Sequence, residues 1–220
     1  AAELVRAQGI AHETHADSSV CYTYQGVEVE HHTAMVDIAT PAKKRYVDEL
    51  VMIQGGVTLE GDSMGRPTME VPAPDINLLM LNAHILKHAL GWGVGLRQLC
   101  DVARLCHRRK EEVNGKEVEE VCRLAGITDW TSLLHSFLID YMGMPEASLP
   151  FATKHISSEP LLCRILRGGN FGQHRKDMDK AASGLLKRKI HTACSFAQNA
   201  AFALRYAPGE GARTFWTLLR

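Results

Sequence analysis

The sequence predicts an α+β protein in which a mixed N-terminal part, residues 1–73, precedes an all-helical part, residues 74–220. Two observations lead to this fold class. Short runs near the N-terminus alternate apolar and polar residues, as β-hairpins do, whereas beyond Asp75 apolar residues recur at helical spacing. We expect the domain boundary at residues 71–74 (VPAP), where the pattern changes. A chain of 220 residues with 45% hydrophobic content is long enough to bury a core.

The mixed part is expected to open with a helix that ends at Gly9 and to continue into a β-hairpin. Residues 20–24 (VCYTY) and 27–35 alternate on either side of a turn that contains Gly26, and this arrangement predicts the hairpin. The chain opens inside a helical pattern and without an initiating Met. We therefore expect a further segment of this part ahead of residue 1.

A second helix and a second hairpin are expected before the boundary. Thr40 is a good N-cap residue and Pro41 suits the first helical position, so together they predict a helix through about residue 54. Residues 57–59 and 68–71 flank a segment rich in turn residues, which predicts a second, weaker hairpin.

The second part is expected to be built from helices alone. The expected helices are residues 76–90, 96–110, 116–125, 129–142, 159–167 and 175–206. Glycines stand where chain-reversing helix ends are expected, at Gly91, Gly126, Gly143 and Gly168. Gly184 is expected to bend the last helix at a cost of up to ~1 kcal/mol relative to Ala. The basic run 187–189 (KRK) is interpreted as a solvated face, with a phosphate or membrane patch as the alternative.

Charge and composition narrow the classes of partner. Lys and Arg number 25 and so do Asp and Glu, so no sequence-wide positive field attracts a nucleic acid duplex. No apolar run approaches the ~18 residues that span a bilayer, and no signal peptide opens the chain, so we expect a cytoplasmic protein without a membrane partner. The six cysteines form no Cys-x-x-Cys pair and are expected to be reduced and buried.

The most informative segment is residues 26–32 (GVEVEHH). Strand alternation places Glu28, Glu30 and His32 on one face, and two like charges at that distance repel each other unless a cation or an arginine lies between them. Carboxylates are the hard oxygen ligands that Mg²⁺ prefers. The alternative is the solvent face of an edge strand, where charge is common.

Two helical pairs form the other candidate positions. His84 and His88 are four residues apart and share a helix face, so they could bind zinc, although core histidines are the simpler interpretation. A zinc protease is excluded because no Glu follows His84 in the H-E-x-x-H manner. Arg97 and Asp101, also four apart, are expected to form a salt bridge worth ~0.5 kcal/mol if it is exposed. If buried, the same pair would position substrate phosphate or the first hairpin.

The order of these motifs resembles the uncharacterised nucleotidyltransferase family of the Bacteroidetes type. The resemblance covers nearly the whole chain and rests on four segments, namely residues 26–32 (GVEVEHH), 82–88 (NAHILKH), 95–101 (GLRQLCD) and 168–172 (GGNFG). It implies a nucleotidyltransferase-like sheet followed by helices, with a nucleotide cleft between them. The implied reaction is Mg²⁺-dependent transfer of a nucleoside monophosphate from an NTP to a hydroxyl of a small molecule or protein, with the acceptor and the oligomeric state left open.

The resemblance also implies roles for single residues. Glu30 matches the third acidic position of the superfamily, where it would bind Mg²⁺ or take the acceptor proton, and Glu28 is the fallback. His32 would support the two glutamates. Substrate binding is implied for the helical motif positions, with Arg97 facing the triphosphate and with His84, His88 and Asp101 beside it.

One element of the superfamily pattern is missing. A Gly-Ser or Gly-Gly turn followed by an Asp-x-Asp pair should precede Glu28, and it is expected ahead of residue 1. Gly168-Gly169 with Asp177 and Asp179 copies the motif superficially. The residues around that aspartate pair are charged and indicate the start of a helix, where acids suit the helix dipole.

Two other classes of function stay open. The first is a helical metal-dependent phosphohydrolase built on His84, His88 and Asp101, although the chain lacks the adjacent His-Asp pair that such enzymes use. The second is a non-catalytic regulatory or toxin-antitoxin-like module that has kept a nucleotidyltransferase shape.

Overall fold

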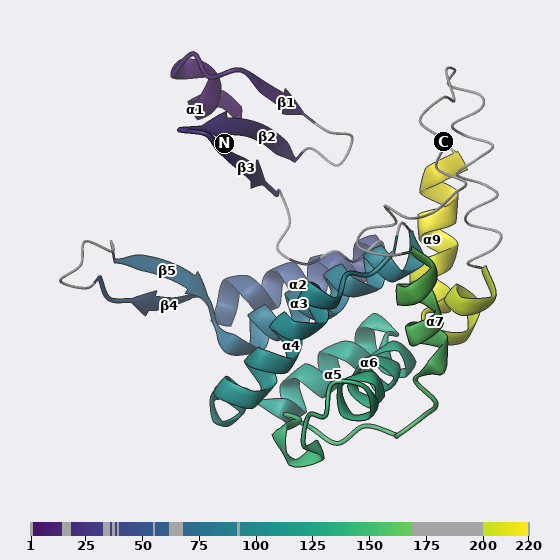
Figure 1. Ribbon diagram of the computed structural model, residues 1–220. Helices are drawn as coiled ribbons and strands as arrows, with labels where there is room; N and C mark the ends of the chain where they lie inside the picture. Colours follow the sequence, from purple (N-terminus) through teal and green to yellow (C-terminus); the bar gives the residue numbers. More distant parts are fainter. Residues whose placement is uncertain are drawn as a thin grey trace. The chain divides into compact units, whose positions relative to one another are not determined.

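A computed structural model describes residues 2–14, 19–32, 36, 38, 40–54, 56–61, 68–91, 93–168 and 200–219 (Figure 1). The chain is divided into two compact units, residues 1–35 and residues 36–220, and each is described by itself. This division falls earlier than the boundary that the sequence predicts at residues 71–74. The predicted α+β class is confirmed, because two small antiparallel sheets accompany a large set of helices.

The first unit is a short helix with a three-stranded antiparallel sheet. Its elements are α1 (Ala2–Ala7), β1 (His12–Thr14), β2 (Val20–Tyr24) and β3 (Val27–His31), and the strand order is β1-β2-β3. The predicted β2–β3 hairpin is confirmed, and its turn places Gln25 at φ 49° and Gly26 at φ 80°. Two successive left-handed residues match the twist of the flanking strands. β1 was not predicted, because a strand of three residues is too short to show alternation.

The second unit begins with a helix and a hairpin, both as predicted. They are α2 (Pro41–Gln54), β4 (Gly56–Leu59) and β5 (Met69–Pro72). Two side chains tie the start of α2 to distant helices, since Lys43 Nζ donates to Ala125 O at 2.7 Å and Thr40 Oγ1 donates to Glu210 Oε1 at 2.8 Å. α2 is therefore anchored to the helical core.

The helices of the second unit follow the predicted ones closely up to residue 168. They are α3 (Pro74–Leu90), α4 (Leu96–Arg109), α5 (Gly115–Ala125), α6 (Thr128–Asp140) and α7 (Glu159–Gly168), with short 3-10 turns at Lys110–Glu112 and Glu146–Ser148. The predicted helix over 175–206 falls mostly outside the described residues, of which 200–206 are helical. Gly126 and Gly143 have the left-handed φ expected of chain-reversing ends, whereas Gly91 does not, with φ at −106°.

One helix was not predicted. α9 (Pro208–Leu219) begins with a proline at its first position, but glycines at 209 and 211 lower the local helix propensity and hide it. Gly211 is needed for packing, because a Cβ at that position would lie 2.6 Å from the Cβ of Ala203. The close packing of Gly211 against Ala203 thus requires a glycine that also weakens the helical signal of α9 in the sequence.

The core of the second unit is centred on α3 and α6. Trp130 is fully buried, and its Nε1 donates to the carbonyl oxygen of Asn82 on α3 at 3.2 Å. Phe202 packs edge-on against Trp130, with ring centroids 6.3 Å apart. α3 also packs against α4 and α5. In the part of the chain that the structure describes, no helix combines the length and apolarity needed to cross a membrane.

The cysteines are only partly as expected. Cys106 and Cys122 are buried, and burial raises the pKa of Cys106 to about 12 and that of Cys122 to about 11, so both thiols stay protonated. Cys100, in contrast, is exposed on α4. The expectation of burial is wrong for Cys100, which lies on the solvent side of an amphipathic helix.

Candidate functional site

The register of the first sheet places the two candidate glutamates on one face. Glu30 pairs with Cys21, which pairs with Glu13 on β1, and Glu28 pairs with Thr23. Directly paired residues share a face of the sheet, so Glu13, Glu28 and Glu30 all lie on the same side. Glu28 and Glu30 are exposed, and together they present two carboxylates from the edge strand β3.

The two neighbouring histidines of this segment have different contacts. His32 Nε2 lies 3.6 Å from Glu30 Oε2, with both side chains nearly half exposed. His31 belongs to the opposite face, where its Nε2 is 3.0 Å from the hydroxyl of Tyr22 and the two rings stack. The side-chain contacts therefore assign His32, and not His31, to the glutamate face.

The face of the sheet that carries Glu28 and Glu30 offers carboxylate oxygens, which are the donor atoms that a hard cation prefers. Mg²⁺ keeps several waters and is usually bound through one or two carboxylates together with substrate phosphates. Glu28 and Glu30 supply two carboxylates on adjacent outward positions of β3. Among the described residues, no group of three His, Cys, Asp or Glu side chains is close enough to hold a metal ion. Any cation on this face would therefore take its remaining ligands from water, phosphate or residues outside the described ranges.

The two histidines of α3 meet as the helical spacing predicts. His84 and His88 are each partly buried, and their Nε2 atoms lie 3.1 Å apart. The rings are edge to face, with centroids 4.5 Å apart. At this distance either one ring donates a hydrogen bond to the other, or both nitrogens point toward a shared ligand.

Arg97 and Asp101 lie on the exposed face of α4, whose opposite face buries Leu99 and Val102. The predicted salt bridge is wrong, because the ion pairs between described residues do not include this one, although both residues are described. An exposed pair gains little Coulomb energy and loses side-chain entropy. Arg97 is therefore an exposed residue that, among the described residues, is not paired with Asp101.

The structure thus forms two groups from the predicted site residues. Glu28, Glu30 and His32 come together in the first unit, and His84 and His88 come together in the second. Asp101 does not join the two histidines in a metal-binding group within the described part of the chain. The donor set of the alternative phosphohydrolase is therefore not formed there.

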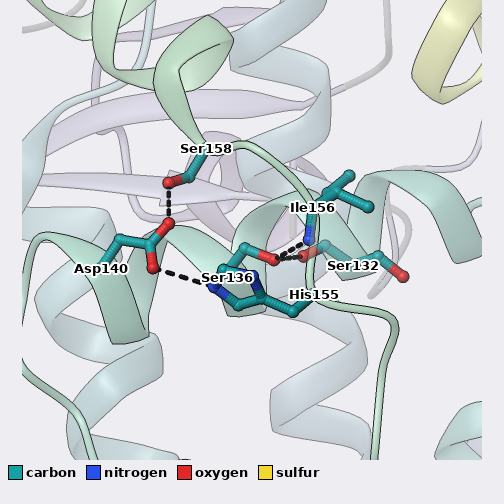
Figure 2. Close-up of polar contacts among 6 residues, drawn as sticks. All are labelled: Ser132, Ser136, Asp140, His155, Ile156 and Ser158. Carbon is teal, nitrogen blue, oxygen red and sulfur yellow. Dashed lines mark hydrogen bonds and ion pairs between the residues drawn. The ribbon is translucent and has the colours of Figure 1, made fainter.

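A third polar group was missed by sequence reasoning. Figure 2 shows Asp140, at the end of α6, between Ser158 and His155. Ser158 Oγ donates to Asp140 Oδ2, and His155 Nε2 lies 2.9 Å from Asp140 Oδ1. These bonds lower the pKa of Asp140, with the hydroxyl of Ser158 as the larger cause and His155 as the smaller.

This third group has the composition of a catalytic triad but not its geometry. A triad histidine bridges the carboxylate and the serine. Here the serine and the histidine both bind the same carboxylate, so His155 does not lie between Asp140 and Ser158 as the base of a triad does. Ser158 directly precedes α7, and its carbonyl oxygen accepts from Leu161 N at 3.0 Å. Asp140, His155 and Ser158 therefore link the end of α6 to the segment before α7, and we call these three residues the staple.

Beside the staple, a second contact holds the same loop to α6. Ser136 Oγ donates to Ser132 O at 2.7 Å and accepts from Ile156 N at 3.0 Å, as Figure 2 shows. The residue before Ser136, His135, is almost fully buried near Thr153, and burial lowers the pKa of His135 to about 4. The only sequence signal for these contacts is the polar segment 153–158 (TKHISS) between two apolar helices.

The comparison with known families gives one finding. The model of a family described as "Uncharacterised nucleotidyltransferase" matches residues 1–138. The match includes the glutamates of β3, the histidines of α3 and the whole of α4, and it ends before Asp140 and its staple. No curated protein and no solved structure matches the chain.

Proposed function

The chain belongs to this uncharacterised nucleotidyltransferase family, and from this premise we propose that it transfers a nucleoside monophosphate from an NTP to a hydroxyl group. The acceptor hydroxyl would belong to a small molecule or a protein. In such a transfer the acceptor oxygen bonds to the α-phosphorus, the bond to the β-phosphate breaks, and pyrophosphate leaves. The reaction needs neutralisation of the triphosphate charge, orientation of the hydroxyl and a destination for its proton.

The observation that carries the proposal is the pair of carboxylates on one face of β3. Glu30 and Glu28 supply the hard oxygen donors that suit Mg²⁺, and Mg²⁺ when bound neutralises charge on a triphosphate. Glu30 is the first choice for this role or for accepting the hydroxyl proton. His32, whose Nε2 lies 3.6 Å from Glu30 Oε2, orients that carboxylate.

Arg97 is the proposed phosphate-binding residue of the second unit. Arg97 is exposed on α4, and the ion pairs among the described residues do not include one with Asp101, so an anion in solvent can reach its side chain. A planar guanidinium binds two phosphate oxygens through two parallel hydrogen bonds of fixed geometry, whereas a lysine ammonium acts as a point charge.

Isothermal titration of the full chain with ATP, GTP, CTP and UTP, with and without Mg²⁺, tests the proposal. We expect at least one NTP to bind in the presence of Mg²⁺, and we expect Glu30→Gln to weaken that binding at least about tenfold, or about 1.4 kcal/mol. Glu70→Gln is the matched control, because Glu70 is an exposed glutamate on a strand of the other sheet. Glu28→Gln should have a smaller effect than Glu30→Gln.

The variants also separate the two proposed roles. The effect of Glu30→Gln should disappear without Mg²⁺, whereas Arg97→Ala should weaken NTP binding with or without the metal. Arg108→Ala, an exposed arginine on the same helix, controls for the loss of one positive charge. If no NTP binds, or if Glu30→Gln behaves like Glu70→Gln, the proposal is wrong and the non-catalytic module becomes the better interpretation.

A further inference from the structure

We propose that His84 and His88 form a binding site for one divalent transition-metal ion of the Zn²⁺, Ni²⁺ or Cu²⁺ class. The site is separate in chemistry from the Mg²⁺ function proposed for Glu28 and Glu30. Imidazole nitrogen suits Zn²⁺, Ni²⁺ and Cu²⁺, whereas Mg²⁺ demands oxygen ligands. This inference goes beyond the proposed nucleotidyl transfer and does not depend on it.

The distance between the two imidazoles carries the inference. Their Nε2 atoms are 3.1 Å apart. Nitrogen ligands lie about 2.0–2.1 Å from zinc, so two nitrogens at this separation would subtend about 100° at the metal. That angle falls between the values for octahedral and tetrahedral coordination. The two rings are therefore already spaced as a pair of ligands to one ion.

The helix holds both ligands in place. His84 and His88 are one turn apart on α3, and their neighbours Ile85 and Ala89 are fully buried, which fixes the rotation of the helix about its axis. The end of the helix is also closed, since Gly93 N donates to the carbonyl oxygen of His88 at 3.0 Å. Ligands whose backbone is fixed in this way lose little entropy when a metal binds.

Within the described part of the chain, the site supplies two protein ligands. Among the described residues, no third His, Cys, Asp or Glu comes close enough to complete a group around these histidines. Two nitrogens leave two or more positions on a tetrahedral or octahedral ion for water or for an incoming ligand. An ion with open positions can bind an exogenous oxygen or nitrogen donor, which a four-ligand structural zinc site cannot do.

Titration of the full chain with ZnCl₂ after treatment with a chelator tests the inference. We expect one equivalent of Zn²⁺ to bind, and we expect both His84→Gln and His88→Gln to weaken this binding at least about tenfold. His107→Gln is the matched control, because His107 is an exposed histidine on the neighbouring helix α4. Circular dichroism of each variant verifies that α3 remains folded.

A measurement on the unmodified chain keeps the test decisive if a variant does not fold. Zn²⁺ should shift the ring-nitrogen NMR resonances of two histidines selectively and should raise the melting temperature with zinc concentration. No zinc binding, or equal binding by His84→Gln, His88→Gln and His107→Gln, would overturn the inference and leave a simple hydrogen bond between the rings. Glu30→Gln should bind Zn²⁺ normally, so failure of this site and failure of the proposed function give different results.

Discussion

The two compact units support their candidate site residues in different ways. In the first unit, Glu28 and Glu30 stand on an edge strand of a small sheet, and among the described residues of that unit the buried hydrophobic ones are Val5 and Val20. In the second unit, His84 and His88 stand on a helix whose other faces are packed into a large core. The first pair is oriented by strand register, and the second pair by the packing of the helix that carries it.

This difference has a consequence for stability. Hydrophobic burial is the main favourable contribution to folding, and it grows with the apolar area removed from water. The first unit buries one valine of α1 and one of β2 among its described residues, whereas the helical core of the second unit contains Trp130, Phe137 and many aliphatic residues. We therefore expect the second unit to resist local unfolding and the first to gain order when it binds a ligand.

The largest effect should come from opening the helical core. Leu99 is fully buried and Leu96 is 56% exposed, although both lie on α4. Leu99→Ala should lower the free energy of unfolding by about 2–5 kcal/mol, because it removes buried methylene groups and leaves a cavity. Leu96→Ala, the same substitution at an exposed position of α4, should cost less than about 1 kcal/mol. Urea denaturation measures both, and equal losses would contradict the burial assigned to this helix.

A pH dependence of similar size should come from the same core. Burial lowers the pKa of His135 to about 4, so the folded state holds this ring neutral while the unfolded state binds a proton below about pH 6.5. The free energy of unfolding should therefore fall as the pH falls from about 6.5 to about 4, by about 3 kcal/mol in all. Stability curves of the original chain and of His135→Gln measure this contribution.

The control for the pH prediction is His107→Gln, which removes an exposed imidazole. It should leave the pH dependence of stability unchanged, whereas His135→Gln should flatten it between pH 6.5 and 4. If both variants have the slope of the original chain, His135 is not held neutral in the folded state.

A smaller effect is expected in the first unit. Val20 is 4% exposed and Val27 is 62% exposed, on paired strands of one sheet. Val20→Ala should destabilise that sheet by about 1–2 kcal/mol through lost hydrophobic burial, and Val27→Ala should do so by much less. Hydrogen exchange should show faster exchange of the β2 and β3 amides while the amides of α6 keep their protection. Uniform acceleration over the whole chain would show that the two units unfold together.

The smallest effect should come from the staple at Asp140. Ser158 and His155 lower the pKa of Asp140, so the stabilisation is present above the unfolded-state pKa and is lost as the pH falls through the folded-state value. Ser158→Ala should move the pKa of Asp140 back toward its ordinary range, and His155→Gln should do so less. The carboxyl carbon shift of Asp140, followed by NMR against pH, measures both changes. Ser148→Ala should leave this titration unchanged, and a larger effect of His155→Gln would reverse the assigned order of causes.

Most of the fold could be predicted because its signals are local. The β2–β3 hairpin, the second hairpin and the helices from α2 to α7 each show their own periodicity or boundary residues. β1 was missed because a strand of three residues is too short to show alternation. α9 was missed because its glycines lower its helix propensity, and Gly211 is required there by its close packing against Ala203. Packing between two segments does not alter the apolar periodicity of either segment, so it cannot be predicted from that periodicity.

The candidate site divides in the same way. Strand alternation alone places Glu28 and Glu30 on one face, and helical spacing alone places His84 beside His88. Only the tertiary structure decided that His31 meets the hydroxyl of Tyr22, that Arg97 does not pair with Asp101, and that Asp140 meets Ser158 and His155. Backbone periodicity determines which face a residue shares. Rotamers, and contacts between residues distant in the chain, determine which atoms meet, and these depend on how the folded elements pack.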